Sequence, residues 1–236
     1  MTRGRLFGLG IGPGDPELLT LKALRLLRRA EAVAYPAPEG GASFARAIVA
    51  EYLRPGQREI ALVFPMRPGP VPEAVYDRAA ALVAAELDRG ADTALLCQGD
   101  PLFYGSFAGI FARLAPHYAV EIVPGVSSLT ACAAAAGRPL ARRDETLTVV
   151  PATLPEDELE RRLAAAEGAA VIKLGRHFAK LRRVLDRLHL TGGTVYVERA
   201  GLPGVRVLPA AEVEPATVPY FATALVRRKG GGDGRD

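Results

Sequence analysis

Short apolar segments alternate with segments of helical periodicity along most of the chain, and this alternation constrains the fold more than any other feature. Residues 6–11 predict a strand, and residues 17–29 predict a helix whose apolar side carries Leu18, Leu21, Leu24, Leu26 and Leu27. Further strands are expected at residues 32–35, 59–63, 93–97, 120–123, 147–150, 170–174, 194–198 and 221–227, and further helices at residues 44–52, 73–88, 129–136, 156–166 and 178–188. The pattern predicts an α/β protein.

Changes in composition divide this pattern into parts. Four prolines, Pro65, Pro68, Pro70 and Pro72, exclude a helix and predict a loop. The polar stretch at residues 138–145 marks the start of a second half. We therefore expect an N-terminal α/β domain at residues 1–137, a C-terminal α/β domain at residues 138–228, and a disordered, Gly-rich and charged tail at residues 229–236.

The composition narrows the class of protein. The chain has 236 residues, of which 49% are hydrophobic and 24% charged, so it is globular and long enough to bury a core. It has no run of about eighteen apolar residues, and its first residues show no signal-peptide cleavage pattern. A cytoplasmic protein that does not enter a membrane is expected.

Metal and disulfide chemistry find no support in the sequence. The two cysteines, Cys97 and Cys132, are too few for a disulfide framework and lack metal-ligand spacing, so buried free thiols are expected. The three histidines form no His-x-x-x-His pair of the kind that binds zinc. The Gly-x-Ser-x-Gly motif of serine hydrolases is absent as well. We therefore expect no bound metal.

The net charge of +4 suggests an acidic ligand. Arginines far outnumber the four lysines, Lys22, Lys173, Lys180 and Lys229, and a guanidinium matches carboxylates and phosphates. The basic residues are scattered and do not form a stripe. Charge alone does not choose between nucleic acid and a small polyanion.

A glycine-rich turn follows the first expected strand, between Gly8 and Pro16. Glycines let the backbone turn sharply and approach a ligand, and Asp15 is expected to cap a helix that begins at Pro16. The dinucleotide fingerprint Gly-x-Gly-x-x-Gly fails because its third glycine would fall on Pro13, and the Gly-Lys-Ser/Thr of a phosphate loop is absent. These two nucleotide-binding modes are excluded.

Two further turns lie at the ends of other expected strands. Gly99-Asp100-Pro101 repeats the Gly-Asp-Pro of the first turn, and Pro124-Gly-Val-Ser-Ser follows residues 120–123. Ligands of open α/β sheets bind beyond the carboxyl ends of the strands, so the three turns are expected to line one crevice. The alternative is that each aspartate only caps its own helix. That alternative is favoured for Asp15 and is weaker for Asp100, because Tyr104-Gly-Ser breaks the helical pattern.

The three turns, in this order, resemble the tetrapyrrole methylases. The residues that carry the resemblance are Gly10-Ile-Gly-Pro-Gly-Asp-Pro-Glu-Leu-Leu-Thr, Gly99-Asp-Pro-Leu-Phe-Tyr-Gly-Ser and Val123-Pro-Gly-Val-Ser-Ser. The resemblance extends to about Arg228. It implies two α/β domains with a cofactor cleft between them, S-adenosylmethionine as methyl donor, a tetrapyrrole substrate and a homodimer. Neither a nucleic acid nor a membrane is an expected partner.

The resemblance also implies roles for individual residues. The cofactor is expected at Pro13, Gly99, Asp100, Phe103, Ser127, Ser128, Leu174, Ala200 and Tyr220. The substrate is expected at Met66, Arg67 and Ser106, and Tyr104 is expected to touch the substrate or assist proton removal.

Within the family, Gly-Asp-Pro-x-x-Tyr-Gly-Ser and Phe64-Pro-Met resemble the branch that methylates precorrin-2 at C20 in corrin biosynthesis. The uroporphyrinogen branch carries an Arg and an acidic residue where this chain has Ser106 and Gly109. The cobalt-bound form of the same substrate stays an alternative, as does an rRNA ribose methylase of the same fold. The family's diphthine synthases share the first turn as well.

Overall fold

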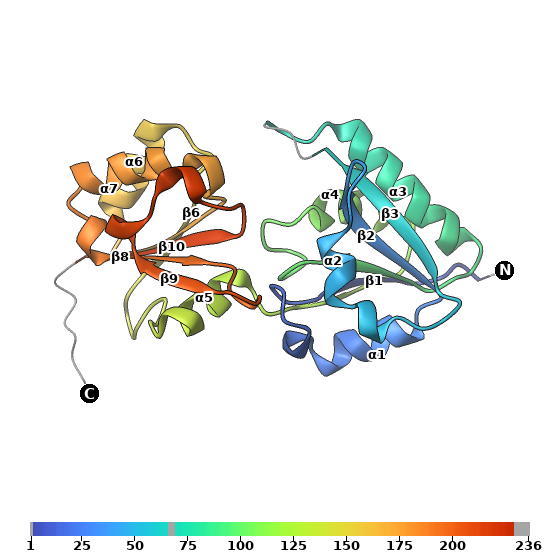
Figure 1. The fold of residues 1–236 in the computed structure, drawn as a ribbon. Coiled ribbons are helices and arrows are strands. Elements are labelled where there is room, and N and C mark those ends of the chain that lie inside the picture. Colours follow the sequence, from blue (N-terminus) through green and yellow to red (C-terminus); the bar gives the residue numbers. More distant parts are fainter. Residues whose placement is uncertain (1, 66–68, 229–236) are drawn as a thin grey trace. The chain divides into compact units, whose positions relative to one another are not determined.

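The computed structural model describes residues 2–65 and 69–228, which fold into two compact units divided between Ser127 and Ser128 (Figure 1). Each unit contains one five-stranded sheet flanked by helices. The expected α/β class with two sheets is confirmed. The expected residues Met66 and Arg67, together with the tail at residues 229–236, lie outside the described residues.

The first unit has a parallel sheet with the strand order β3-β2-β4-β1-β5. Its strands are β1 (Leu6–Gly10), β2 (Ala32–Pro38), β3 (Arg58–Phe64), β4 (Thr93–Cys97) and β5 (Val120–Val123). Its helices are η1 (Pro16–Leu18), α1 (Leu21–Arg29), α2 (Phe44–Ile48), η2 (Ala50–Tyr52), α3 (Glu73–Asp88) and α4 (Phe107–Leu114). Helices α1 and α2 cover one face of the sheet, and α3 and α4 cover the other. Every residue of β1 and β4 is therefore buried, as expected for a parallel sheet covered on both faces.

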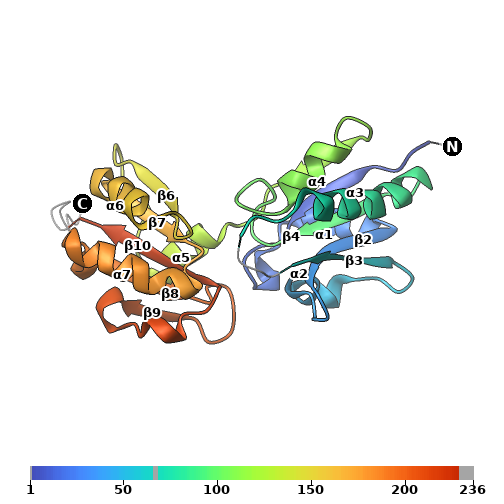
Figure 2. The same cartoon turned by 90° about the horizontal axis from the view of Figure 1, so that it is seen from above.

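The second unit has a mixed sheet with the order β6-β7-β10-β8-β9 (Figure 2). Its strands are β6 (Leu147–Pro151), β7 (Gly168–Ile172), β8 (Thr194–Glu198), β9 (Arg206–Pro209) and β10 (Ala222–Arg227). Its helices are α5 (Ser128–Ala136), α6 (Glu156–Ala165), α7 (Phe178–Arg187), η3 (Gly175–His177), η4 (Thr191–Gly193), η5 (Ala210–Glu212) and η6 (Pro215–Thr217). Strand β10 is antiparallel to both of its neighbours, β7 and β8. The start of β10 therefore lies beside the ends of β7 and β8.

The boundary between the units differs from the expected one. It falls between Ser127 and Ser128, and not after Gly137. Helix α5 belongs to the second unit because Leu129 and Cys132 pack with buried residues of that sheet, among them Ala170 and Val197.

The first expected helix also differs in detail. Its residues form the short η1 and then α1, which Thr20 caps by accepting a hydrogen bond from the Ala23 N–H. Leu26 and Leu27 are buried, as expected, together with Ala23, but the break makes Leu21 the first residue of α1 and leaves it 86% exposed. The expectation that Leu21 is on the apolar side is wrong.

Helix α4 and strand β9 were not expected from the sequence, and neither were the short helices η3, η4, η5 and η6. Both Cys97 and Cys132 are buried and free, as expected. Among the described residues, no helix is long and apolar enough to cross a membrane.

Candidate functional site

The three glycine-rich turns meet at the carboxyl end of the first sheet, because they follow β1, β4 and β5, which are neighbours. The turns after β1 and β4 form a bridge in which the Gly99 N–H donates to the Gly12 carbonyl at 2.8 Å. Both glycines have positive φ, +75° at Gly12 and +71° at Gly99, a conformation that side chains disfavour. Glycine is thus required at both ends of this bridge.

The turn after β5 joins the other two by direct backbone contact. A Cβ atom on Gly10 would lie 2.4 Å from the Gly125 nitrogen, and a Cβ on Gly125 would lie 2.2 Å from the Gly99 oxygen. No room for a side chain exists between these backbones. Gly10, Gly99 and Gly125 therefore hold the three turns together, and we call residues 10–14, 98–101 and 124–127 the glycine cradle.

The two aspartates of the Gly-Asp-Pro repeats, Asp15 and Asp100, differ in their hydrogen-bond partners. The Asp15 Oδ1 accepts a hydrogen bond from the Glu17 N–H at 2.9 Å and caps η1. The Asp100 Oδ1 likewise accepts from the Leu102 N–H at 2.9 Å, but its Oδ2 accepts from the Gly125 N–H at 3.1 Å. Asp100 therefore links the turn after β4 to the turn after β5, whereas Asp15 caps its own helix.

Pro13 and Gln98, which both belong to the glycine cradle, are joined by a hydrogen bond. Pro13 is buried, and its carbonyl accepts a hydrogen bond from the Gln98 amide at 3.4 Å. Sequence reasoning missed Gln98, although its place directly before Gly99 was an available signal. Ser127 is half-buried at the end of the first unit, and Ser128 is exposed where α5 begins.

The loop after Asp100 exposes apolar and aromatic side chains. Leu102 is 59%, Phe103 37% and Tyr104 48% exposed. The rings of Phe103 and Tyr104 meet edge to face with their centroids 5.0 Å apart. Tyr104 has φ +57°, a conformation that is rare outside glycine and that concentrates at functional sites. An exposed aromatic pair of this kind suits a large, flat ligand.

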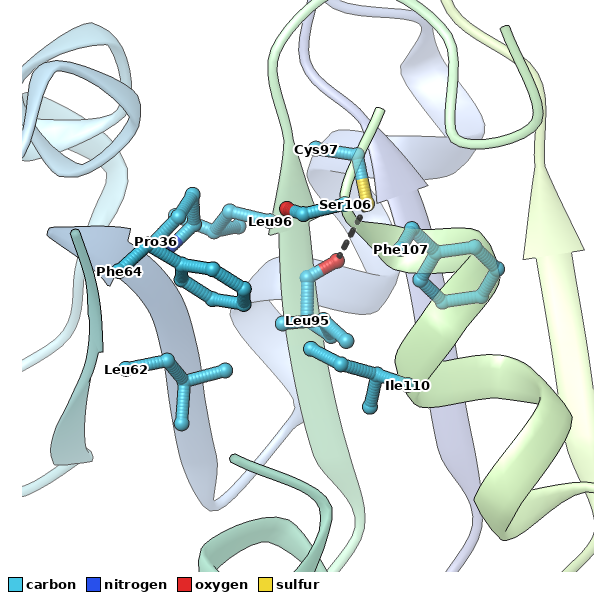
Figure 3. A pocket seen from close by; sticks show the side chains of 9 residues that line it. All are labelled: Pro36, Leu62, Phe64, Leu95, Leu96, Cys97, Ser106, Phe107 and Ile110. Atoms are coloured by element: carbon cyan, nitrogen blue, oxygen red, sulfur yellow. Dashed lines mark hydrogen bonds between the residues drawn. The ribbon is translucent and has the colours of Figure 1, made fainter. Parts of the chain in front are cut away.

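Ser106 follows this loop in the chain and lines a small pocket of the first unit (Figure 3). The pocket is otherwise lined by Pro36, Leu62, Phe64, Leu95, Leu96, Cys97, Phe107 and Ile110. Almost all of these are core side chains, and none belongs to the glycine cradle. Burial raises the pKa of the Cys97 thiol, so this thiol is not a nucleophile at neutral pH.

The second unit brings together the other three expected residues. Leu174 follows β7, Ala200 follows β8, and Tyr220 precedes β10, which lies between those strands. Leu174 and Ala200 are buried among core residues, whereas Tyr220 is 68% exposed. Leu174 and Ala200 can thus offer a ligand their backbone atoms, and Tyr220 can offer its ring.

The charged groups give no sign of a metal centre. Within residues 2–65 and 69–228, no group of three or more His, Cys, Asp and Glu side chains is placed to hold a metal ion. The site that the described residues support is a backbone cradle with aromatic neighbours.

A family model for tetrapyrrole (corrin/porphyrin) methylases matches residues 5–214. The chain is 47% identical to the cobalamin biosynthesis protein CobIJ of Mycobacterium tuberculosis (strain ATCC 25618 / H37Rv), over 95% of this chain and 46% of that protein. It thus spans about half the length of this relative. It is 40% identical to a precorrin-2 C(20)-methyltransferase of a Sinorhizobium species, over 94% of this chain and 95% of the relative. It is 33% identical to a cobalt-precorrin-2 C(20)-methyltransferase of Salmonella typhimurium, over 96% and 97% of the two chains.

Solved structures share the fold. A uroporphyrin-III C-methyl transferase from Thermus thermophilus, complexed with S-adenyl homocysteine, has a TM-score of 0.70 and 28% identity, over 95% of this chain and 97% of that chain. A cobalt precorrin-4 methyltransferase has a TM-score of 0.75 at 24% identity, over 94% of both chains. The second likeness concerns the fold alone.

Proposed function

The chain belongs to the tetrapyrrole methylases, and from this premise we propose that it transfers a methyl group from S-adenosylmethionine to C20 of precorrin-2, giving precorrin-3A. The observation that carries the proposal is the glycine cradle, in which three backbone turns meet at the carboxyl end of one sheet. The names of two relatives, which the chain matches over nearly their whole length, support this substrate and this ring position.

The residues of the cradle fit the proposed cofactor. Glycine at each contact keeps side chains away from the turns, so that a ligand can approach the backbone directly. We assign the cofactor to Pro13, Gly99, Asp100, Phe103, Ser127 and Ser128, with Leu174, Ala200 and Tyr220 from the second unit. When bound, S-adenosylmethionine supplies a methyl group on a positively charged sulfur. The homologous structure with S-adenyl homocysteine supports this donor.

The proposed reaction requires the protein mainly to align the methyl donor with the substrate and to exclude water. In the proposed reaction a nucleophilic ring carbon of the substrate would bond to the methyl group as the methyl–sulfur bond breaks and S-adenosylhomocysteine leaves, and the ring would then lose a proton. The apolar Pro13 and the exposed ring of Phe103 suit a pocket in which the positive charge disappears during the reaction. Tyr104 is our candidate for touching the tetrapyrrole or assisting proton removal. Ser106, Met66 and Arg67 are our candidates for binding it.

We propose that the enzyme is a cytoplasmic homodimer that binds neither nucleic acid nor a membrane. The absence of a basic stripe from the sequence supports a small substrate over RNA.

A second candidate substrate is the cobalt-bound form of precorrin-2. The Salmonella relative is named for it, at 33% identity. The Sinorhizobium relative, named for the metal-free form, is 40% identical, which favours the metal-free substrate.

The proposal is tested by incubating the protein with S-adenosylmethionine and either precorrin-2 or its cobalt form without oxygen. Mass and absorbance spectra of the tetrapyrrole are then recorded. We expect one added methyl group on precorrin-2. Parallel incubations contain uroporphyrinogen III or structured RNA, and methylation of one of these in place of both precorrin-2 forms would refute the proposal.

A further inference from the structure

Two strand ends of the second unit share a local sequence and conformation. Residues 173–175 follow β7 and residues 199–201 follow β8, and each triplet reads basic, apolar, glycine. The basic residues, Lys173 and Arg199, have φ +58° and +57°. The apolar residue of each triplet is buried, and the glycines have φ +36° and +76°. We call these two triplets the basic turns.

Both basic turns contact the segment that leads into β10. The Arg199 N–H donates to the Phe221 carbonyl at 2.9 Å. A Cβ atom on Gly175 would lie 3.8 Å from the Cα of Tyr220. Since β10 pairs with β7 and β8 (Figure 2), the basic turns flank the start of this strand and its exposed Tyr220.

The backbone of the basic turns is strained at matching places. A left-handed conformation is unfavourable for a residue with a side chain, and such strain is concentrated at functional sites. Asparagine and glycine tolerate the conformation far better than lysine or arginine. The strain therefore does not account for the choice of a basic residue at both positions.

Among residues 2–65 and 69–228, the charge of Arg199 has no partner of opposite sign. Several arginines elsewhere in this unit pair with glutamates, as Arg183 does with Glu156 at 2.6 Å. In the described part of the chain Arg199 forms no such ion pair; its Nε donates to the Pro203 carbonyl at 3.2 Å. The neighbouring carboxylate of Glu198 is bound by Arg206 at 3.0 Å and by the Tyr196 hydroxyl.

We propose that Lys173 and Arg199 form a carboxylate-binding pair at this edge of the second sheet. The inference rests on the proposed function, because both the amino-acid part of S-adenosylmethionine and the rim of a precorrin carry carboxylates. A guanidinium and an ammonium are suited to bind either one.

Glycine variants separate the charge from the backbone. Arg199→Gly and Lys173→Gly keep the left-handed conformation without strain but remove the charge, so both are expected to fold. Arg199→Lys keeps a positive charge. Arg161→Ala is the control for net charge, because it removes a guanidinium that is paired with Glu158. Alanine is used here because Arg161 lies inside α6, where glycine would destabilise the helix.

The affinities of three probes decide the proposal. We measure the binding of S-adenosylhomocysteine, of 5′-methylthioadenosine, which lacks the amino-acid carboxylate, and of uroporphyrin, a stable tetrapyrrole with carboxylates around its rim. If the site binds the carboxylate of the cofactor, Arg199→Gly lowers the affinity for S-adenosylhomocysteine about tenfold and leaves the affinity for 5′-methylthioadenosine unchanged. If the site binds a carboxylate of the tetrapyrrole, Arg199→Gly lowers only the affinity for uroporphyrin, and Arg199→Lys restores part of that affinity.

Unchanged affinities for all three probes in both glycine variants would overturn the proposal, as would an equal loss in Arg161→Ala. The binding measurements do not depend on turnover. A wild-type protein that binds the probes but leaves precorrin-2 unmethylated would refute the proposed function and leave the carboxylate pair to be decided by these affinities.

Discussion

The Asp100 carboxylate accepts a hydrogen bond from the Gly125 N–H at 3.1 Å, across 25 residues of sequence. Its other oxygen holds the Leu102 N–H at 2.9 Å. One side chain thus fixes the positions of two turns of the glycine cradle. We therefore propose that Asp100 supports cofactor binding by holding the backbone of these two turns in place.

Replacing Asp100 with alanine should weaken both folding and cofactor binding. The change leaves the Gly125 N–H without its carboxylate partner, and the loss of a hydrogen bond to a charged group is worth about 1.5 to 3 kcal/mol. Urea unfolding measures the loss of stability, and calorimetry with S-adenosylhomocysteine measures the affinity. Asp15→Ala is the matched control, because Asp15 caps η1 and its loss is expected to reach only about 1 kcal/mol. Equal effects of the two variants on affinity would contradict the role of Asp100.

Gly125→Ala should be among the most destabilising single substitutions in the first unit. Its Cβ would lie 2.2 Å from the Gly99 oxygen and 2.7 Å from the Gly10 Cα, so the backbone must move. Forcing atoms into a filled space typically destabilises by about 1 to 3 kcal/mol. Thermal unfolding measures this loss.

Gly105→Ala is the control, since a Cβ there would lie 3.6 Å from the nearest atom, the Pro101 oxygen. The same unfolding measurement should show a small effect for it. A Gly125→Ala protein as stable as Gly105→Ala would show that the three turns do not meet as closely as described.

Tyr104 is tested by two substitutions that change different properties. Tyr104→Phe keeps the ring but removes the hydroxyl, and it should lower kcat about tenfold or more if the hydroxyl assists proton removal. Tyr104→Asn tolerates the φ of +57° but removes the ring, and it should raise KM for the tetrapyrrole. Steady-state kinetics measure both. Unchanged turnover of Tyr104→Phe would eliminate the proton role.

The ion pair between Arg46 and Glu59 should make stability depend on pH. Arg46 contacts this carboxylate at 2.8 and 3.0 Å, and the hydrogen bond from its guanidinium lowers the pKa of Glu59. A lowered pKa means that the folded protein gains stability above the pKa of the unfolded chain and loses it as the pH falls through the folded pKa. The difference in unfolding free energy between wild type and Arg46→Met should therefore shrink below about pH 4.

Denaturant titrations from pH 7 to pH 3 measure this difference. In a Glu59→Gln background, Arg46→Met should produce no pH-dependent difference over the same range. A difference that persists there would assign the effect to another group.

The sequence predicted much of the fold because the local signals were strong. Strand β4 and helix α3 were expected with the observed bounds, since their apolar patterns end sharply. Helix α4 was missed because it is short, at eight residues, and follows the irregular Tyr104–Ser106 loop. Leu21 was misplaced because the helix restarts after Thr20, which makes Leu21 the exposed first residue of α1.

The site could be predicted only in part. The glycine turns are visible as motifs, but the contact of Asp100 with Gly125 depends on β1 lying between β4 and β5, an order that no local pattern reveals. Likewise, the basic turns at Lys173 and Arg199 become equivalent only when β10 is seen to lie between β7 and β8. Such relationships arise from topology and not from spacing along the chain.

The most direct test of the central claim is the position of the transferred methyl group. The protein is incubated with precorrin-2 and S-adenosylmethionine whose methyl carbon is ¹³C, and the product is examined by NMR. The account predicts a single labelled methyl group on C20. A label at any other ring carbon, or its absence from the tetrapyrrole while S-adenosylhomocysteine binds normally, would contradict it.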